Sequence, residues 1–143
     1  LMEAITGRSL WPSYSYIRQY YQHADLTKHT DRPACEYSAS ITLGYDYTNL
    51  EDDYHWPVYI EGTPINLTVG NAVVYKGMEK PHWREKLTGS SHCQLFLHWV
   101  DQKGEWAKYC KYDGRPWLGA PASAKFPSLL EAYQQKLKQI SVS

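Results

Sequence analysis

The sequence predicts a mainly β protein in which short strands are joined by tight turns, as in a sandwich or barrel. Apolar and polar residues alternate in two separate stretches, residues 36–45 and 92–100, as expected when a strand presents one face to a core. Between these stretches, short runs of strand-forming residues are separated by turns that contain glycine and proline.

The first predicted strand is the aromatic-rich segment 14–21, which leads toward His29, Thr30 and Asp31. The next strand, residues 36–45, has two distinct faces. Tyr37, Ala39, Ile41, Leu43 and Tyr45 lie on one side, with Glu36, Ser38, Ser40 and Thr42 on the other. The acidic segment 46–55 follows, and its turn-forming composition favours a solvated loop over a metal site.

Three shorter strands are expected within residues 57–61, 65–68 and 72–75, with turns at 62–64 and 69–71. The last strand, residues 92–100, alternates again. Cys93, Leu95, Leu97 and Trp99 share one face, and His92, Gln94, Phe96 and His98 share the other. Because each alternating strand has an apolar and a largely polar face, we expect the apolar face to be covered by packing and the polar face to line a cavity.

The spacing of apolar residues changes toward the end of the chain. Residues 102–127 contain several glycines and prolines and predict irregular surface chain. A capping box at Ser128 and Glu131 then precedes apolar residues at helical spacing, so a C-terminal helix is expected. The length suits a single domain, 1–143, and the start at Leu1 leaves open whether N-terminal elements are missing.

Composition argues against several classes of partner. The formal net charge is zero and there is no run of basic residues, so nucleic acid is not an expected partner. No apolar stretch is long enough for a membrane span, and no leader resembles a signal peptide, so we expect no membrane association. Cys35, Cys93 and Cys110 are odd in number and form no Cys-x-x-Cys pair, which favours a reduced, cytoplasmic protein.

Three residues predict a metal centre. His29 and Asp31 are two positions apart, so in a strand or its extension both side chains project to the same side. His82, preceded by Pro81 in a loop-like setting, would supply the third ligand. Two imidazoles and one carboxylate, with the remaining positions open, are the ligand set of non-haem Fe(II) oxygenases.

The sequence resembles the core of the 2-oxoglutarate- and Fe(II)-dependent oxygenases, with the prolyl-hydroxylase-like branch closest. The resemblance covers roughly residues 14–101. It rests on Arg18–Tyr20, Leu26–Arg32, Cys35–Ser38, Gly77–Glu85 and Gln94–His98, in that order along the chain. It implies a double-stranded β-helix, or jelly-roll, in which His29, Asp31 and His82 hold iron at the open end.

The resemblance also implies a cosubstrate site. The family holds the distal carboxylate of 2-oxoglutarate with an Arg or Lys about ten residues after the second histidine, but this chain has Ser91, His92 and Cys93 there. His92 matches the position. Arg84 is the chemical alternative, because it lies on the same side of an extended chain as His82. Tyr20 is a further expected contact of the cosubstrate.

The implied activity is that of a dioxygenase: hydroxylation of a peptidyl side chain or a small amino-acid-like molecule, with release of succinate and CO2. Because residues 91–93 lack the Arg or Lys that the family has there, two alternatives stay open. One is a non-catalytic β-barrel that binds metal or a small ligand, and the other is a cupin-like metalloenzyme that uses no 2-oxoglutarate. His98 is expected to face the cavity, where a structural role is the commoner one. The identity of the substrate and the oligomeric state stay open.

Overall fold

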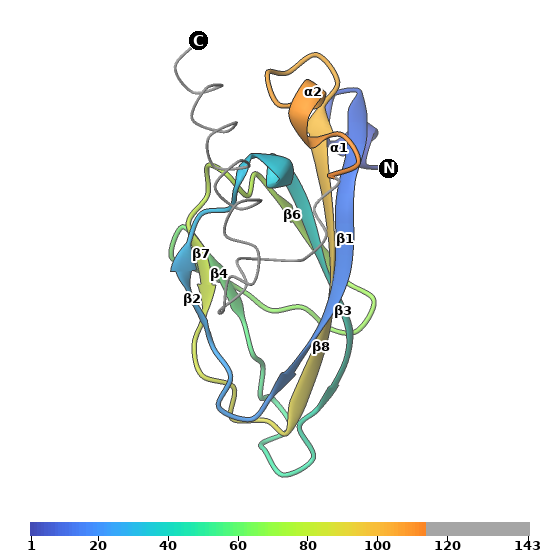
Figure 1. Ribbon diagram of the computed structural model, residues 1–143. Helices are drawn as coiled ribbons and strands as arrows, with labels where there is room; N and C mark the ends of the chain where they lie inside the picture. Colours follow the sequence, from blue (N-terminus) through green and yellow to red (C-terminus); the bar gives the residue numbers. More distant parts are fainter. Residues whose placement is uncertain (114–143) are drawn as a thin grey trace, which may run out of the picture. The chain divides into compact units, whose positions relative to one another are not determined.

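In the computed structural model, which describes residues 1–113, the strands form two four-stranded antiparallel sheets (Figure 1). The strand order is β1-β8-β3-β6 in one sheet and β2-β7-β4-β5 in the other. Strands distant in sequence are therefore neighbours in both sheets, and the chain crosses repeatedly between them. This is a jelly-roll, the mainly β fold that the sequence predicted.

The larger sheet consists of β1 (Leu10–Tyr21), β8 (Ser91–Asp101), β3 (Tyr37–Asp46) and β6 (Ala72–Tyr75). The smaller sheet consists of β2 (Leu26–His29), β7 (His82–Arg84), β4 (Val58–Ile60) and β5 (Thr63–Ile65). The described helices are short: α1 (Met2–Thr6), the 3-10 turn η1 (Pro33–Cys35) and α2 (Ala107–Cys110). No helix within residues 1–113 has both the length and the apolar character needed to cross a bilayer.

Most of the predicted strands are confirmed to within a few residues, and β6 coincides with its prediction. The strand predicted at residues 65–68 was wrong, because β5 lies earlier, at Thr63–Ile65. The turn is tighter than expected: Glu61 and Gly62 both have positive φ, 53° and 92°, as in a two-residue hairpin. Pro64 is accommodated because β5 is an edge strand, where a missing N–H breaks no ladder.

Two strands and both α-helices of the described residues, α1 and α2, were missed, as was the 3-10 turn η1. Strands β2 and β7 have only four and three residues, too few to show a period, and His82 belongs to β7 and not to a loop. Helix α2 is a single turn within the segment that was expected to be irregular. The C-terminal helix predicted from Ser128 lies outside the described residues.

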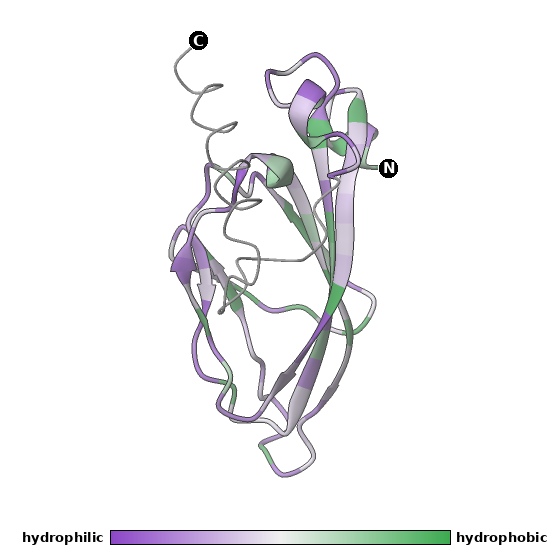
Figure 2. Ribbon diagram, viewed as in Figure 1, coloured by the Kyte–Doolittle hydropathy of each residue, from purple (hydrophilic) through white to green (hydrophobic). Residues whose placement is uncertain are grey.

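The polar faces of β3 and β8 point into the barrel, as predicted. The register pairs Ser38 with His98 and Thr42 with Gln94, and all four side chains are buried. Figure 2 shows hydrophobic and hydrophilic residues mixed along the larger sheet, in place of uniformly apolar strands. The interior of the barrel is therefore lined in part by groups that form hydrogen bonds.

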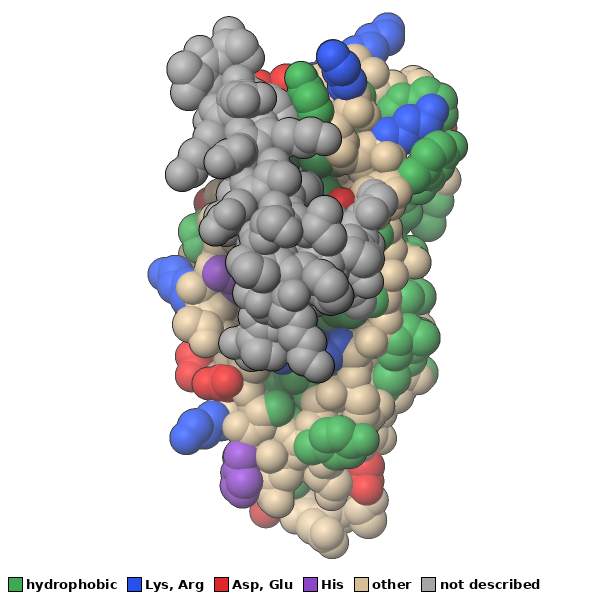
Figure 3. Space-filling view, in the orientation of Figure 1, with side chains coloured by type: hydrophobic (Ala, Val, Ile, Leu, Met, Phe, Trp, Pro, Cys, Tyr) green, Lys and Arg blue, Asp and Glu red, His purple; other side chains and the backbone are tan. Residues whose placement is uncertain are grey.

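The apolar faces of β3 and β8 form the outer surface of the larger sheet. Ile17, Leu95, Ile41 and Ala72 are successive register partners across all four strands. Within the described residues this face is covered only in part: Tyr37 and Ala39 are buried, whereas Ile17 is 63% and Leu43 is 41% exposed. Figure 3 shows hydrophobic side chains along the edge of the molecule where β1 and β3 lie.

A chain of buried hydrogen bonds crosses the interior at the start of β8. The Tyr47 hydroxyl bonds to His92 Nδ1 at 2.7 Å, and His92 Nε2 bonds to Gln94 Oε1 at 2.7 Å. Gln94 Nε2 then donates to Ser40 Oγ at 2.8 Å, and Thr42 Oγ1 donates to Gln94 Oε1 at 3.3 Å. Because Gln94 Oε1 only accepts, His92 Nε2 carries the proton and Nδ1 accepts from Tyr47. His92 is thus a fully bonded, neutral imidazole.

This bonding makes the stability of the fold depend on pH. Burial lowers the pKa of His92 to about 4, whereas a histidine in the unfolded chain titrates near 6.5. The unfolded state therefore binds the extra proton first, and stability is lost as pH falls from about 6.5 to 4. For His92→Gln, we expect the free energy of unfolding, measured with urea, to vary less steeply over this range. Between wild type and variant, the slope of the free energy of unfolding against pH should differ by up to about 1.4 kcal/mol per pH unit.

Replacement of the exposed His55 by Gln is the matched control and should keep the pH dependence of the wild type. An unchanged slope in His92→Gln would contradict the assignment of a neutral imidazole at this position.

Candidate metal centre

The centre is built where β2 and β7 pair. His29, the last residue of β2, is the register partner of His82, the first residue of β7, and their ring centroids are 4.4 Å apart. Asp31 follows two residues later, where its backbone N–H donates to Gly77 O at 2.8 Å. Two histidines separated by more than fifty residues thus meet across one strand pair, with the carboxylate held beside them.

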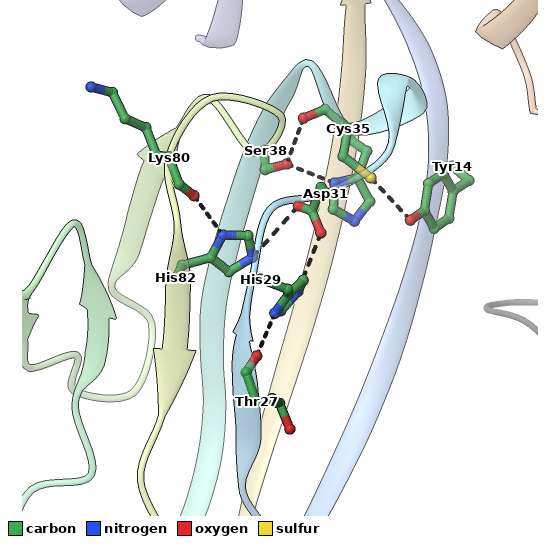
Figure 4. Close-up of polar contacts among 9 residues, drawn as sticks. Tyr14, Thr27, His29, Asp31, Cys35, Ser38, Lys80 and His82 are labelled. Atoms are coloured by element: carbon green, nitrogen blue, oxygen red, sulfur yellow. Dashed lines mark hydrogen bonds and ion pairs between the residues drawn. The ribbon is translucent and has the colours of Figure 1, made fainter. Parts of the chain in front are cut away.

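The three side chains converge as a ligand set. His29 Nε2 lies 3.5 Å from Asp31 Oδ1, and His82 Nε2 lies 3.6 Å from Asp31 Oδ2. One donor atom from each residue lies within 4.8 Å of the other two. Figure 4 shows the Asp31 carboxylate between the two imidazoles. The spacing suits a cation that draws in each ligand to about 2 Å.

The hydrogen bonds of the two imidazoles fix which nitrogen is available. His29 Nδ1 bonds to Thr27 O at 2.6 Å, and His82 Nδ1 bonds to Lys80 O at 2.9 Å (Figure 4). A carbonyl oxygen only accepts, so both Nδ1 atoms carry a proton, and Nε2 is the atom of each ring that faces Asp31 and can coordinate a cation once it is deprotonated. Histidine ligands of metals commonly have their other nitrogen oriented in this way.

The two histidines differ in their electrostatics. His82 is 3% exposed, and burial lowers its pKa, so the ring is neutral near pH 7 and ready to coordinate. The hydrogen bond to Asp31 raises the pKa of the more exposed His29, because the carboxylate favours imidazolium. A proton on His29 competes with a cation for the same nitrogen, so metal affinity should fall as pH decreases through this raised pKa.

A second feature of the interior is a buried guanidinium on β7. Arg84 lies two residues after His82 on the same strand and is 3% exposed. Its Nη1 donates to Trp56 O at 2.5 Å, and its Cζ lies 4.5 Å from the centroid of the Trp56 ring. Arg84 Nη2 is buried without a hydrogen-bond partner among the described residues. Burial lowers the pKa of Arg84, but the group stays charged because arginine titrates so high.

Tyr20 also packs against Trp56. Its ring is 5.0 Å from that of Trp56 in an edge-to-face contact, and its hydroxyl is also buried without a partner within residues 1–113. Two buried donors, the hydroxyl of Tyr20 and Nη2 of Arg84, therefore share one aromatic wall. A buried donor without a partner costs about 1–3 kcal/mol, which an anionic ligand placed between them would offset.

His92, the other expected cosubstrate residue, is close to this wall but has no vacant nitrogen. Its ring lies 5.2 Å from that of Trp56, and both nitrogens have the partners described above. The sequence analysis did not identify Trp56. Its signal was weak, because an aromatic residue in an acidic turn-rich segment suggests packing as readily as a binding site.

Comparisons with known proteins support the fold. No protein-family model and no curated protein matches the sequence. Among solved structures, the chain is similar to an oxidoreductase of the 2OG-Fe(II) oxygenase family from Burkholderia pseudomallei. The TM-score is 0.53 and the identity 16%, over 69% of this chain and 48% of that one. This chain therefore spans about half the length of that oxygenase.

Two further structures are similar. The non-haem monooxygenase ThoJ, solved as a nickel complex, has a TM-score of 0.51 and 13% identity, covering 96% of this chain and 70% of that one. An RmlC-like cupin from Shewanella frigidimarina has a TM-score of 0.42 and 15% identity, covering 64% and 68%. At these identities the likeness shows the fold alone, a jelly-roll, and it rests on the two oxygenase structures with TM-scores above 0.5.

The convergence of the ligand set predicts the effect of removing one ligand. For His82→Ala, we expect the affinity for Fe(II), measured by anaerobic titration, to fall by at least about 100-fold, since a residue that binds the ion directly should matter no less than the residues that orient it. His55→Ala, an exposed change, should leave the affinity unchanged. Equal affinities for His82→Ala and the wild type would contradict the assigned centre.

Gly77 predicts a second effect, because it leaves room for the ligands. A Cβ at this position would collide with the Asp31 carboxylate and would lie 2.7 Å from Cys35 O and 2.9 Å from Ser38 Oγ. For Gly77→Ala we expect a loss of about 1–3 kcal/mol in the free energy of unfolding, together with weaker metal binding.

Gly44→Ala is the matched control, because a Cβ there has nothing within 4 Å. It should bind metal as the wild type does. Wild-type affinity in Gly77→Ala would show that Asp31 does not depend on the space at Gly77.

Proposed function

We propose that this chain is the catalytic core of an Fe(II)- and 2-oxoglutarate-dependent oxygenase of the prolyl-hydroxylase-like kind. The substrate class would be a peptidyl side chain or a small amino-acid-like molecule, and the reaction a hydroxylation. One observation carries the proposal. Two Nε2 lone pairs and a carboxylate converge at one point, and an incompletely bonded arginine follows two residues later on the same strand.

The residues present fit the required groups. His29, Asp31 and His82 would occupy one face of an iron ion and leave the remaining positions open for ligands. Residues two apart in a strand are separated by about 6.5 Å along it, so Arg84 lies one such step from His82. A short dicarboxylate that chelates iron through its keto acid end can thus direct its far carboxylate toward the guanidinium.

Each part of the proposed anchor has a separate task. Arg84 would donate a charge-assisted hydrogen bond from Nη2, while its bond to Trp56 O keeps the planar group oriented. The hydroxyl of Tyr20, whose ring packs against the same indole, would donate to the same carboxylate. Trp56, 5% exposed, would exclude water, which strengthens both interactions in the resulting low-dielectric site.

When bound, iron and 2-oxoglutarate supply the oxygen-activating chemistry, and the protein contributes position and electrostatics. The neutral rings of His29 and His82 keep their Nε2 lone pairs aimed at the cation, because the carbonyls of Thr27 and Lys80 hold their Nδ1 protons. Succinate and CO2 are the expected coproducts.

The alternative is a cupin-like β-barrel that binds metal but does not use 2-oxoglutarate. The observation that favours it is the bonding of His92, because the β8 position expected for a cosubstrate anchor holds a neutral imidazole with both nitrogens engaged. The two functions differ in whether Arg84 receives a carboxylate.

The first test is spectroscopic and needs no substrate. Anaerobic addition of 2-oxoglutarate to the Fe(II)-loaded full chain should produce a visible charge-transfer band, and admission of oxygen should yield succinate. For Arg84→Gln, we expect the 2-oxoglutarate concentration at half-saturation to rise by about 10-fold or more, since a charged hydrogen bond contributes about 1.5–3 kcal/mol. Its affinity for Fe(II) should be unchanged.

Arg8→Gln removes an exposed guanidinium, 60% accessible, and is the matched control, with no expected effect on either ligand. Absence of the band in wild-type protein with iron bound would favour the cupin-like alternative. If the charge-transfer band of Arg84→Gln is titrated by the same 2-oxoglutarate concentrations as that of the wild type, Arg84 is not the anchor, but the proposed function stands.

A further inference from the structure

Asp31 belongs to a second group of possible ligands. Asp31, Cys35 and His98 each offer one donor atom, and these atoms lie within 4.8 Å of one another. Cys35 ends the 3-10 turn η1 and is 1% exposed, and His98 lies on β8 and is 4% exposed. Neither residue belongs to the centre proposed for iron, so this second group brings a thiol and a third imidazole to the other centre's carboxylate.

The hydrogen bonds of His98 leave one nitrogen for a ligand. Ser38 Oγ lies 2.9 Å from His98 Nδ1 and 3.3 Å from Cys35 O. The carbonyl only accepts, so both bonds form together when Ser38 donates to Cys35 O and His98 Nδ1 donates to Ser38. His98 Nε2 then carries a lone pair, and this atom is buried without a partner within residues 1–113.

This arrangement repeats the pattern of His29 and His82. In all three rings Nδ1 is bonded within the protein, directly to a carbonyl or through the Ser38 hydroxyl, and Nε2 remains for coordination. Such support is common for histidines that bind metals. A buried lone pair without a donor costs about 1–3 kcal/mol, and a cation offsets that cost as effectively as a hydrogen bond.

The surroundings of Cys35 suit a thiolate. The Tyr14 hydroxyl lies 3.1 Å from Cys35 Sγ, and the Tyr14 ring contacts that of His98 at 4.5 Å (Figure 4). Burial raises the pKa of Tyr14, so its hydroxyl keeps its proton and can donate to sulfur. Arg32 lies with its Cζ 4.6 Å above the Tyr14 ring, and its guanidinium is paired with Asp113.

Gly77 packs closely against the residues of this group. A side chain at this position would press on the Asp31 carboxylate, Cys35 O and Ser38 Oγ together. The same backbone therefore bounds both groups that contain Asp31.

We propose that Asp31, Cys35 and His98 form a second divalent cation site, which shares the Asp31 carboxylate with the centre that His29 and His82 complete. One carboxylate oxygen, one thiolate sulfur and one imidazole nitrogen match the donors of Zn²⁺, whereas Mg²⁺ and Ca²⁺ prefer oxygen alone. Binding releases the Cys35 proton to solvent and forms a metal–sulfur bond, with no change of oxidation state. The inference shares Asp31 with the proposed function but does not depend on 2-oxoglutarate.

The test uses Co²⁺ as a spectroscopic substitute for Zn²⁺ on the full-length chain freed of metal and reduced. Wild-type protein should bind two equivalents, and one of the two binding phases should show the intense near-ultraviolet absorption of a cobalt–thiolate bond. Cys35→Ser should lose this absorption and one equivalent. His98→Gln should weaken the sulfur-containing phase by at least about 10-fold, because it removes a ligand. Cys93→Ser, a change at a half-buried cysteine on the same strand as His98, is the matched control and should retain both phases.

Two outcomes would overturn the inference: a wild-type protein that binds cobalt without thiolate absorption, or an absorption that persists in Cys35→Ser. If Cys35→Ser does not fold, the His98→Gln titration and the wild-type spectrum still decide. His82→Ala separates the two sites, because it should abolish the phase without sulfur and keep the phase with sulfur. A failed 2-oxoglutarate titration beside an intact cobalt–thiolate band would refute the proposed function and leave the second site standing.

Discussion

The antiparallel pairing of β2 with β7 is the constraint on which the rest of the site depends. Each strand is too short to be stable alone, and their pairing places His29 opposite His82. The hydrogen bond from the Asp31 N–H to Gly77 O holds the Asp31 backbone in place, so that its carboxylate lies beside the two histidines. Three ligand atoms from two distant parts of the sequence converge because a register and one backbone hydrogen bond allow a single arrangement.

The larger sheet complements the β2–β7 pair because its polar face is turned toward the interior. An apolar inner face would pack more simply, but it would offer nothing to orient an imidazole or to bind an anion. Ser38 holds His98, and Gln94 holds His92, through bonds that leave each ring in one tautomer. Buried polar groups of this kind are tolerated only when they are bonded, so the interior consists of short hydrogen-bonded chains with a few atoms unpartnered. Three of those atoms, on Tyr20, Arg84 and His98, are the ones for which we propose ligands.

The inward-facing polar groups also set the charge of the interior. Arg84 brings a permanent positive charge into a site that excludes water, and a cation beside Asp31 would add more. Such an interior favours anionic ligands and suits a dicarboxylate better than a neutral molecule. The second group around Cys35 would balance an additional cation with a thiolate, so Asp31 could serve two ions without an excess of positive charge.

The sequence alone determined the fold class, because residues 36–45 and 92–100 alternate with a period of two, which is a local property of the chain. It also determined the spacing of His29 and Asp31, which is local. What it could not determine is register. The pairing of His29 with His82, the exposure of Leu43 on the outer face and the position of Trp56 against Arg84 depend on contacts between residues far apart in the chain. The grouping of His98 and Cys35 with Asp31 was decided in the same way. His98 looked like a structural histidine because only tertiary structure shows that Ser38 occupies one of its nitrogens and leaves the other unpartnered.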